Sequence, residues 1–310
     1  MRTLDAIDSW WRPAVPAERL AAVRVLTGLF TFVYLAARVP HTLSYIGFPA
    51  RQFAPVGVLA SLGAPPPGWL VVAVTVAAVA SALAFLLGWR FRVTGPLCAA
   101  LSLVTLSYAN SWGQIFHTEN ALAVFLVVLA LCPAADALSL DARRRGAAPP
   151  PPDPRYGWPL RLLSVVVVAT YFIAGVAKLR WGGPGWAGGA VLRDTIAADS
   201  LRKILLGSSH SPVAEVLLGQ GWLFRGLAVL TLVVELGAPL ALLGRRAALV
   251  WAAAVVGFHL GVVLLMAIFF PFPMSGVAFA PFLRAERVIE WARVRVARFR
   301  SRRGATPRAS

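Results

Sequence analysis

The chain has 310 residues, of which 58% are hydrophobic and only 14% are charged, and its mean hydropathy is +0.72. Soluble globular proteins carry about 25% charged residues, so this composition excludes an ordinary soluble enzyme and indicates a protein that crosses a membrane several times. The formal charge of +17 does not indicate nucleic-acid binding, because the arginines lie at the ends of apolar segments and in the C-terminal tail, where they determine topology.

The apolar segments, taken in chain order, predict an all-α, polytopic bundle of about seven or eight transmembrane helices with amphipathic helices on the membrane surface. Residues 1–18 include two tryptophans and two prolines and are expected to lie at the membrane interface. The first helix is expected to end before Pro40, because proline interrupts the helical hydrogen-bond ladder. The predicted membrane helices are 19–39, 69–88, 93–109, 121–138, 159–180, 223–243 and 247–270.

The segments between and after these helices indicate the domain organisation. Residues 139–158 contain three consecutive arginines and a run of four prolines, which is typical of a flexible basic loop between two halves. Residues 187–222 predict amphipathic surface helices, and 271–283 is either an eighth crossing or a re-entrant segment. We therefore expect one transmembrane domain over 1–283 and a basic amphipathic tail over 284–310 that contacts anionic lipid.

The distribution of arginine predicts a cell-membrane protein with cytoplasmic N- and C-termini. Of the connectors expected outside, 110–120 and 271–273 contain no arginine and 40–68 contains only Arg51. The 181–222 segment breaks the pattern with Arg193, Arg202 and Lys203, but long segments are translocated regardless of charge. The inside C-terminus implies an even number of crossings, most simply eight, and Lys178 then lies toward the outer face. The arginines expected inside are Arg2, Arg12, Arg90, Arg92, Arg143, Arg144, Arg145, Arg155, Arg245 and Arg246, together with those of the tail.

Two further features concern cysteine use and processing. Cys98 and Cys132 both lie in apolar segments, so the sequence predicts no disulfide framework, and we expect no metal site. The first apolar segment carries Arg24 and has no small-residue cleavage site in a suitable place. It is therefore expected to remain as a membrane helix and not to be removed as a signal peptide.

The most informative stretch is 160–186. Its apolar run ends close to Lys178, and helical spacing places Tyr171, Gly175 and Lys178 on one face. Of the 30 basic residues only two are lysines, Lys178 and Lys203. Lysine, unlike arginine, can lose its proton in apolar surroundings. Lys178 is therefore either a base or a lysine that extends its ammonium group to the interface.

Other polar residues at membrane depth or at its edge are Arg24, Glu235, His259 and a cluster of His117, Glu119 and Asn120. Glu235 is either a structural ion-pair partner of Arg24 or Lys178 or part of a reactive site. His259 is either a hydrogen-bonded core residue or a functional one. The sequence contains no motif of the common soluble enzymes. Any chemistry must therefore use a lipid-soluble cofactor or a substrate delivered through the membrane.

The segment YFIAGVAKL at 171–179, followed by GW at 185–186, resembles the signature of the vitamin K-dependent γ-carboxylase-like family, also called HTTM proteins. Three other stretches fit that family in the same order: VRVLTG at 23–28, residues 120–141 ending in ALSLD, and FHLGVVLLMAIFFPFPM at 258–274. The resemblance implies a membrane enzyme in which Lys178 is a base toward a reduced quinone, menaquinone or a vitamin K-like molecule. We assign the supporting polar positions to Glu235, His259, Arg24, Tyr171, His117 and Asn120.

Two departures from the carboxylase open an alternative. The carboxylase has a histidine shortly before its Ser-x-Asp sequence, and the corresponding residue here is Asp136. The carboxylase also has a large extramembrane substrate domain, whereas this chain continues only as a short basic tail. The alternative is a non-catalytic accessory protein for the maturation or export of a secreted peptide or toxin. A transporter is disfavoured, because the sequence shows no inverted repeat.

Overall fold

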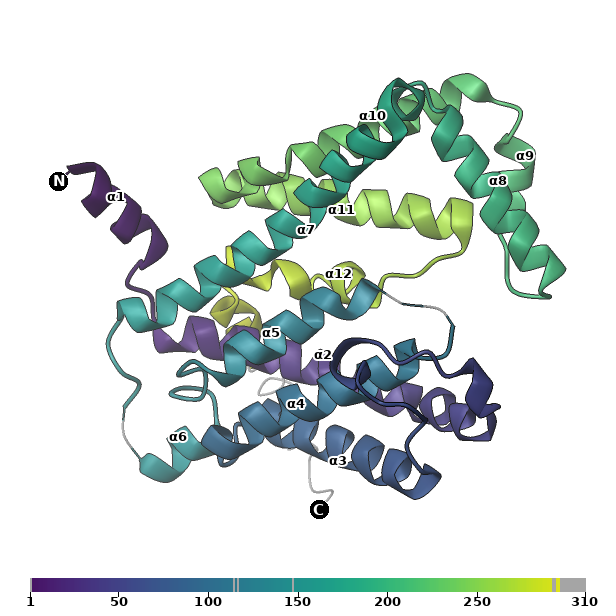
Figure 1. Cartoon of the computed structure of the whole chain (residues 1–310). Coiled ribbons are helices and arrows are strands. Elements are labelled where there is room, and N and C mark those ends of the chain that lie inside the picture. The colour runs from purple at the N-terminus through teal and green to yellow at the C-terminus, as the bar shows by residue number, and fades with distance from the viewer. Residues whose placement is uncertain (1, 114, 116, 147, 292–293, 296–310) are drawn as a thin grey trace, which may run out of the picture. The chain divides into compact units, whose positions relative to one another are not determined.

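The computed structural model describes residues 2–113, 115, 117–146, 148–291 and 294–295 (Figure 1). Regular structure among these residues is helical, apart from an isolated bridge between Val15 and Asp153. Six of the helices are long and apolar enough to cross a membrane. The prediction of an all-α, multi-pass membrane protein is confirmed.

The chain divides into two compact units, Met1–Leu163 with Leu283–Ser310, and Ser164–Phe282. The helices of the first unit are α1 (Arg2–Trp11), α2 (Ala17–Ser44), α3 (Gly68–Leu87), α4 (Phe91–Asn110), α5 (Asn120–Ala130), α6 (Leu140–Arg145) and the first part of α7 (Pro154–Ala187). The second unit contains the rest of α7, then α8 (Ala190–Leu205), α9 (Pro212–Leu217), α10 (Gly221–Leu236), α11 (Arg245–Met266) and α12 (Pro271–Met274). Short 3-10 turns η1 (Tyr45–Gly47), η2 (Ala50–Gln52), η3 (Gly57–Leu59), η4 (His117–Glu119), η5 (Ala238–Leu243) and η6 (Val277–Phe282) join them.

In the first unit, α2, α3, α4 and α5 pack against one another in chain order, and α5 also contacts α2 (Figure 1). The helices approach closely because the facing residues are small. A Cβ atom on Gly28 of α2 would lie 2.8 Å from the Cα atom of Leu86 in α3, so a larger residue would separate the two helices. Small residues at helix contacts are what allow membrane helices to pack without a hydrophobic driving force between them.

The second unit has amphipathic helices at one side of its long helices. The helices α8 and α9 contact α10 and α11 (Figure 1), and Ile196, Phe224 and Leu265 form a buried apolar cluster among them. The polar face of α8 carries Asp199, which binds Arg202 at 2.9 Å and Lys203 at 2.7 Å. The predicted amphipathic segment 187–222 thus corresponds to α8 and α9.

Arg24 is the largest fully buried side chain of the first unit, with no exposed surface. Its guanidinium group donates hydrogen bonds to the carbonyl oxygens of Phe85 at 2.6 Å and Leu86 at 2.7 Å, which lie in the last turn of α3. It also donates to the carbonyl oxygens of Ala134 at 3.0 Å and Leu138 at 2.6 Å. Backbone carbonyls at a helix end and in irregular chain need such donors where water is absent. Arg24 therefore has a structural role.

Contacts within the first unit gather several helix starts at one end of it. Val15, before α2, exchanges backbone hydrogen bonds with Asp153, before α7. The carboxylate of Asp141 in α6 accepts from the backbone N–H groups of Arg90 at 2.9 Å and Phe91 at 2.8 Å, at the start of α4. We call this the arginine end, because it carries the exposed side chains of Arg12, Arg90, Arg92, Arg143, Arg144, Arg145 and Arg155.

The number of membrane-crossing helices is smaller than predicted, six by length and composition against seven or eight. The predicted helix 121–138 ends at Ala130, because Pro133 follows and the chain then forms irregular turns whose carbonyl oxygens bind Arg24. Residues 120–139 nevertheless run along the whole length of α4. They begin beside its last residue, Asn110, which contacts Glu119, and they end at the arginine end, where Asp141 binds Arg90. The segment 271–283 contains only the four-residue α12 and the turn η6.

The boundaries of α2 and α7 also differ from the predicted ones. The first helix does not end before Pro40 but continues to Ser44, because one proline removes a single hydrogen bond and membrane helices tolerate that loss. The predicted helix 159–180 corresponds to α7, which begins earlier, at Pro154, and runs to Ala187. One residue within it, Gly183, has a non-helical backbone conformation. The tail from 284 is described only to 291 and at 294–295, and the rest of that prediction lies outside the described residues.

Replacing Arg24 by methionine should destabilise the first unit strongly. Four buried carbonyl oxygens would lose their donor, and each unsatisfied group costs about 1–3 kcal/mol. We expect a loss of at least about 3 kcal/mol in the free energy of unfolding, measured by denaturant titration in detergent micelles. Arg92→Met, which alters an exposed arginine of α4, is the matched control and should change stability little. Equal stability of the two variants would contradict the structural role of Arg24.

Candidate functional site

An ion pair between α7 and α10 forms the centre of the polar cluster in the second unit. The ammonium nitrogen of Lys178 lies 2.6 Å from Oε1 of Glu235 and donates a hydrogen bond to it. The Glu235 side chain is 2% exposed, whereas that of Lys178 is 22% exposed. The carboxylate is thus enclosed by protein, and the pair is accessible from the lysine side.

The close approach of α10 to α7 depends on Gly175. A Cβ atom at this position would lie 3.0 Å from the Cβ atom of Glu235 and 3.0 Å from a methyl group of Leu236. Gly175 lies one helical turn before Lys178 on the same face. The sequence pattern of a small residue beside a lysine therefore has a physical purpose, because it allows Glu235 to reach the ammonium group.

Trp186 also contacts Lys178. The ammonium nitrogen is 5.3 Å from the centroid of a Trp186 ring, a cation–π contact. Trp186 reaches back toward Lys178 because Gly183 interrupts α7 with a backbone conformation that is non-helical. Trp181, by contrast, is 81% exposed and stacks with Arg180. The sequence predicted only interfacial roles for both tryptophans, so it did not reveal the contact with Lys178.

A second polar pair lies within the same unit, between α7 and α11. The hydroxyl oxygen of Tyr171 is 2.8 Å from Nε2 of His259, and both side chains are buried. The ring of Trp251 packs edge-on against Tyr171, and its N–H group donates to the carbonyl oxygen of Val234 at 2.9 Å. His259 is therefore buried and hydrogen-bonded, which both interpretations of the sequence allow.

Besides Oδ2 of Asp199, which forms an ion pair with Lys203, three buried polar atoms of this unit lack a hydrogen-bond partner among the described residues: Oε2 of Glu235, Nε1 of Trp186 and Nδ1 of His259. Buried polar atoms are nearly always paired, so each exception calls for an explanation. Two of the three atoms belong to the side chains that contact the Lys178 ammonium group. The polar surroundings of Lys178 are therefore incompletely satisfied by the protein itself.

The remaining predicted site residues do not join this cluster within the second unit. Arg24 belongs to the first unit, and so does Asn120, which begins α5 and is exposed. The side chain of His117 lies outside the described residues. Glu235 is paired with Lys178 and not with Arg24, which decides between the two partners that the sequence left open.

The first unit has a polar cluster of its own around Glu119, which is 5% exposed. Its carboxylate accepts hydrogen bonds from the hydroxyl group of Tyr34 and from the amide group of Asn110, and Arg38 lies 3.8 Å away. A cavity of about 310 Å³ beside it is lined by Ser107, Asn110, Glu119, Asn120 and several apolar residues. The sequence indicated Glu119 and Asn120 but not Tyr34 or Arg38, which come from α2.

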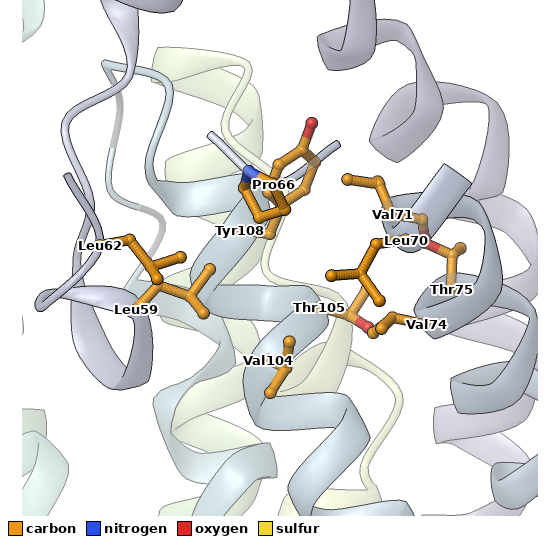
Figure 2. A pocket seen from close by; sticks show the side chains of 10 residues that line it. All are labelled: Leu59, Leu62, Pro66, Leu70, Val71, Val74, Thr75, Val104, Thr105 and Tyr108. Atoms are coloured by element: carbon orange, nitrogen blue, oxygen red, sulfur yellow. The ribbon is translucent and has the colours of Figure 1, made fainter. Parts of the chain in front are cut away.

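A smaller, apolar cavity of about 140 Å³ lies between α3, α4 and the η3 turn of the first unit. Figure 2 shows the side chains of Leu59, Val74 and Val104 around it, with Tyr108 at one side. Its lining is almost entirely hydrocarbon, with Thr75 and Thr105 both bonded back to their own helices. Such a cavity suits methylene groups and does not provide a polar site.

The part of the chain that the structure describes contains no group of three or more His, Cys, Asp or Glu side chains that could hold a metal ion. A metal-dependent mechanism therefore has no ligand set among these residues. Cys98 and Cys132 are both buried and free.

Comparison with protein families decides the relationship of the chain. The model of the HTTM domain matches residues 11–285, which is most of the sequence. The chain belongs to the HTTM family. No curated protein and no solved structure was found to match it. The resemblance based on YFIAGVAKL is thereby confirmed at the level of the family, and the HTTM domain includes both units and both polar clusters.

Asp136 of this HTTM domain takes part in an ionic network at the arginine end. Its carboxylate accepts a hydrogen bond from the hydroxyl group of Tyr156 at 2.9 Å and pairs with Arg155 at 3.3 Å and Arg145 at 3.7 Å. These partners are arginines and a tyrosine that join α7 to the irregular turns before α6. Asp136 thus carries a structural carboxylate in this chain.

The Lys178–Glu235 pair in the HTTM domain can be tested by a double-mutant cycle. Lys178→Met would leave a buried carboxylate unpaired, and Glu235→Leu would leave the ammonium group without its anion. Removing one partner of a buried pair costs about 3–5 kcal/mol, whereas replacing both by apolar residues is often neutral. We expect a loss of about 3 kcal/mol for Lys178→Met and near-complete recovery in the Lys178→Met/Glu235→Leu double variant, measured by thermal unfolding in detergent.

The outcome of this cycle shows whether the Lys178–Glu235 ion pair stabilises the protein. A lysine that only extends its ammonium group to the interface would tolerate Lys178→Met without loss, and the effects of the two single substitutions would add. Arg180→Met, two positions further on the exposed part of α7, is the control for removing a cation near that helix end.

Proposed function

We propose that this HTTM protein is a membrane enzyme that uses a reduced quinone, with Lys178 as the base and Glu235 as its ionic partner. The observation that carries the proposal is a lysine, 22% exposed, whose ammonium group lies 2.6 Å from a carboxylate that is 2% exposed. Intramembrane ionisable pairs of this kind mark functional sites more often than not, because their burial is costly.

The chemistry begins with the proton that the two side chains share. Lysine becomes a base only when its nitrogen is unprotonated, and apolar surroundings favour that neutral form. Across 2.6 Å, a proton can reside on Nζ of Lys178 or on Oε1 of Glu235. In the second arrangement both groups are neutral, and the electron pair of Nζ accepts a hydrogen bond from Oε1–H. Nζ can then accept a proton from a bound molecule once that Oε1–H group turns away.

The residues around Lys178 fit a quinol. A quinol, when bound, supplies phenolic protons and two reducing electrons. The protein provides a nitrogen that can accept a proton, an unpartnered carboxylate oxygen and an aromatic ring, all in an apolar helical unit. Tyr171 and His259 stabilise each other nearby and provide polar support. Membership of the HTTM family supports a menaquinone or vitamin K-like molecule in this role.

Retention of a quinone by the purified protein tests this function. The full chain would be purified from native membranes in mild detergent, and its lipids extracted and identified by mass spectrometry. We expect a menaquinone-type molecule with the wild type, at least tenfold less with Lys178→Ala, and an unchanged amount with Arg180→Ala. Equal retention by Lys178→Ala, or no quinone in any sample, would overturn the proposal.

We propose that the arginine end faces the cytoplasm, so that both termini are inside and Lys178 lies toward the outer face. Seven exposed arginines at one end of the first unit support this orientation under the positive-inside rule. Lys178 follows Arg155 on α7 by about 34 Å of helical rise, roughly the thickness of the hydrocarbon core.

Cysteine labelling of intact cells tests the orientation. In a Cys98→Ala/Cys132→Ala background, Arg144→Cys should resist a membrane-impermeant maleimide, and Ser61→Cys should react with it. Both positions are exposed in the structure, so the difference reports only the side of the membrane. The reverse pattern would place the arginine end outside and contradict the orientation.

A second candidate function is a non-catalytic accessory role in the maturation or export of a secreted peptide. The specific observation in its favour is the ionic network of Asp136, which uses a position equivalent to a carboxylase histidine for a structural purpose. In the purification experiment, a small peptide retained equally by wild type and Lys178→Ala, without quinone, would support this role.

A further inference from the structure

Two buried atoms beside the Lys178 ammonium group have complementary hydrogen-bonding character. Oε2 of Glu235 can only accept while the carboxylate is ionised, and Nε1 of Trp186 can only donate. Both are inaccessible to solvent, and both lack a partner among the described residues. Each belongs to a side chain in direct contact with Lys178, Glu235 through the 2.6 Å ion pair and Trp186 through the ring contact at 5.3 Å.

Leaving these two atoms unpaired is costly. An unsatisfied buried donor or acceptor has lost its hydrogen bonds to water without replacement, and the penalty is larger when the group is charged. The protein keeps Glu235 at 2% exposure although only one of its two oxygens is bonded to Lys178. Protein sites that bind a hydroxyl group have this character, because their polar atoms are left unpaired when the hydroxyl group is missing.

We propose that Glu235 and Trp186 form a hydroxyl-recognition site beside Lys178. The ligand hydroxyl group donates to Oε2 of Glu235 and accepts from Nε1 of Trp186, while Oε1 of Glu235 keeps its hydrogen bond from Lys178. The ligand is a phenol on an apolar body, because a phenolic hydroxyl group donates strongly to a carboxylate and an apolar body suits the hydrocarbon surroundings. The identification of this phenol with a quinol rests on the proposed function.

The contrast with Trp181 supports the assignment. Trp181 is 81% exposed and stacks with Arg180, as expected for a tryptophan that anchors a helix at the membrane interface. Trp186, five residues later, is turned toward Lys178 and has its N–H group buried. An anchoring tryptophan places its N–H group among water and headgroups, so burial of the Trp186 N–H group points to a different purpose.

The experiment compares ligands with and without the hydroxyl group. Menadiol, its dimethyl ether and 1-naphthol would be titrated anaerobically into the full-length protein in nanodiscs, with dissociation constants measured by calorimetry. We expect the wild type to bind menadiol about tenfold more tightly than the ether, since one hydrogen bond to a charged group is worth about 1.5 kcal/mol or more. This ligand comparison requires no substitution in the protein.

Matched variants then locate the effect. Trp186→Phe keeps an aromatic ring and removes the N–H donor. Glu235→Gln keeps the shape of the side chain but replaces one accepting carboxylate oxygen by an NH2 group, which only donates. Trp186→Phe should weaken menadiol binding five- to tenfold, and Glu235→Gln should abolish the preference for menadiol over the ether. Trp181→Phe is the control and should bind all three ligands as the wild type does. Thermal unfolding of each variant would verify that it is folded.

The outcomes separate this inference from the proposed function. Equal binding of menadiol and its ether by the wild type would overturn the hydroxyl site, and so would equal effects of Trp186→Phe and Trp181→Phe. If menadiol bound tightly and equally well to the wild type, Trp186→Phe and Glu235→Gln, the result would refute the hydroxyl site but remain consistent with the quinol function. Binding of 1-naphthol with the same dependence on Trp186 and Glu235, in a protein that retains no quinone from cells, would support the site and refute the quinol function.

Discussion

Charged and polar groups in the hydrocarbon layer must find partners within the protein, because no water is present to solvate them. This constraint organises both units. In the first unit, Arg24 binds four carbonyl oxygens and holds the end of α3 beside the turns that follow α5. In the second unit, the carboxylate of Glu235 is held by Lys178. The two cations serve different purposes: all hydrogen bonds of Arg24 go to the backbone, whereas Lys178 binds an ionisable partner.

The small residues of the helices follow from the same constraint. Polar atoms can reach one another across a helix interface only when the backbones approach closely. Gly175 allows α10 to approach α7 so that Glu235 reaches Lys178, and Gly28 allows α3 to approach α2 near the carbonyl oxygens that Arg24 binds. Each cation therefore has a glycine about one turn away on its own helix. At that glycine, a helix that carries a partner of the cation approaches closely.

The sequence was sufficient to predict an all-helical membrane protein and its family, because these depend on composition and on local motifs. It also narrowed the partner of Glu235 to two cations. It did not predict that Trp186 contacts Lys178, since that contact depends on the bend at Gly183. It overestimated the number of crossings, because the length of an apolar segment does not reveal whether a proline such as Pro133 ends the helix early.

The site in the first unit shows the same limit. Glu119 and Asn120 were visible as a polar cluster in the sequence, but the partners of Glu119 come from distant parts of the chain, with Tyr34 and Arg38 on α2. Local patterns indicate which residues are unusual at membrane depth, whereas pairing across helices requires the packed structure. For the same reason, the structural role of Asp136 became evident only from its contacts with Arg155 and Tyr156.

The hydrogen bonds of Arg24 have a consequence for the order in which this protein is made. Its acceptors are separated from it by 61 and 62 residues on α3 and by 110 and 114 residues at the turns after α5. A charged arginine within a membrane helix is unfavourable at insertion until its guanidinium group finds partners. During synthesis, α2 must therefore carry an unsatisfied charge until α3 has followed it, and its final bonds form only after residue 138 has left the ribosome. The helix α2 thus reaches its final hydrogen bonds only after α3, α4 and α5 have followed it.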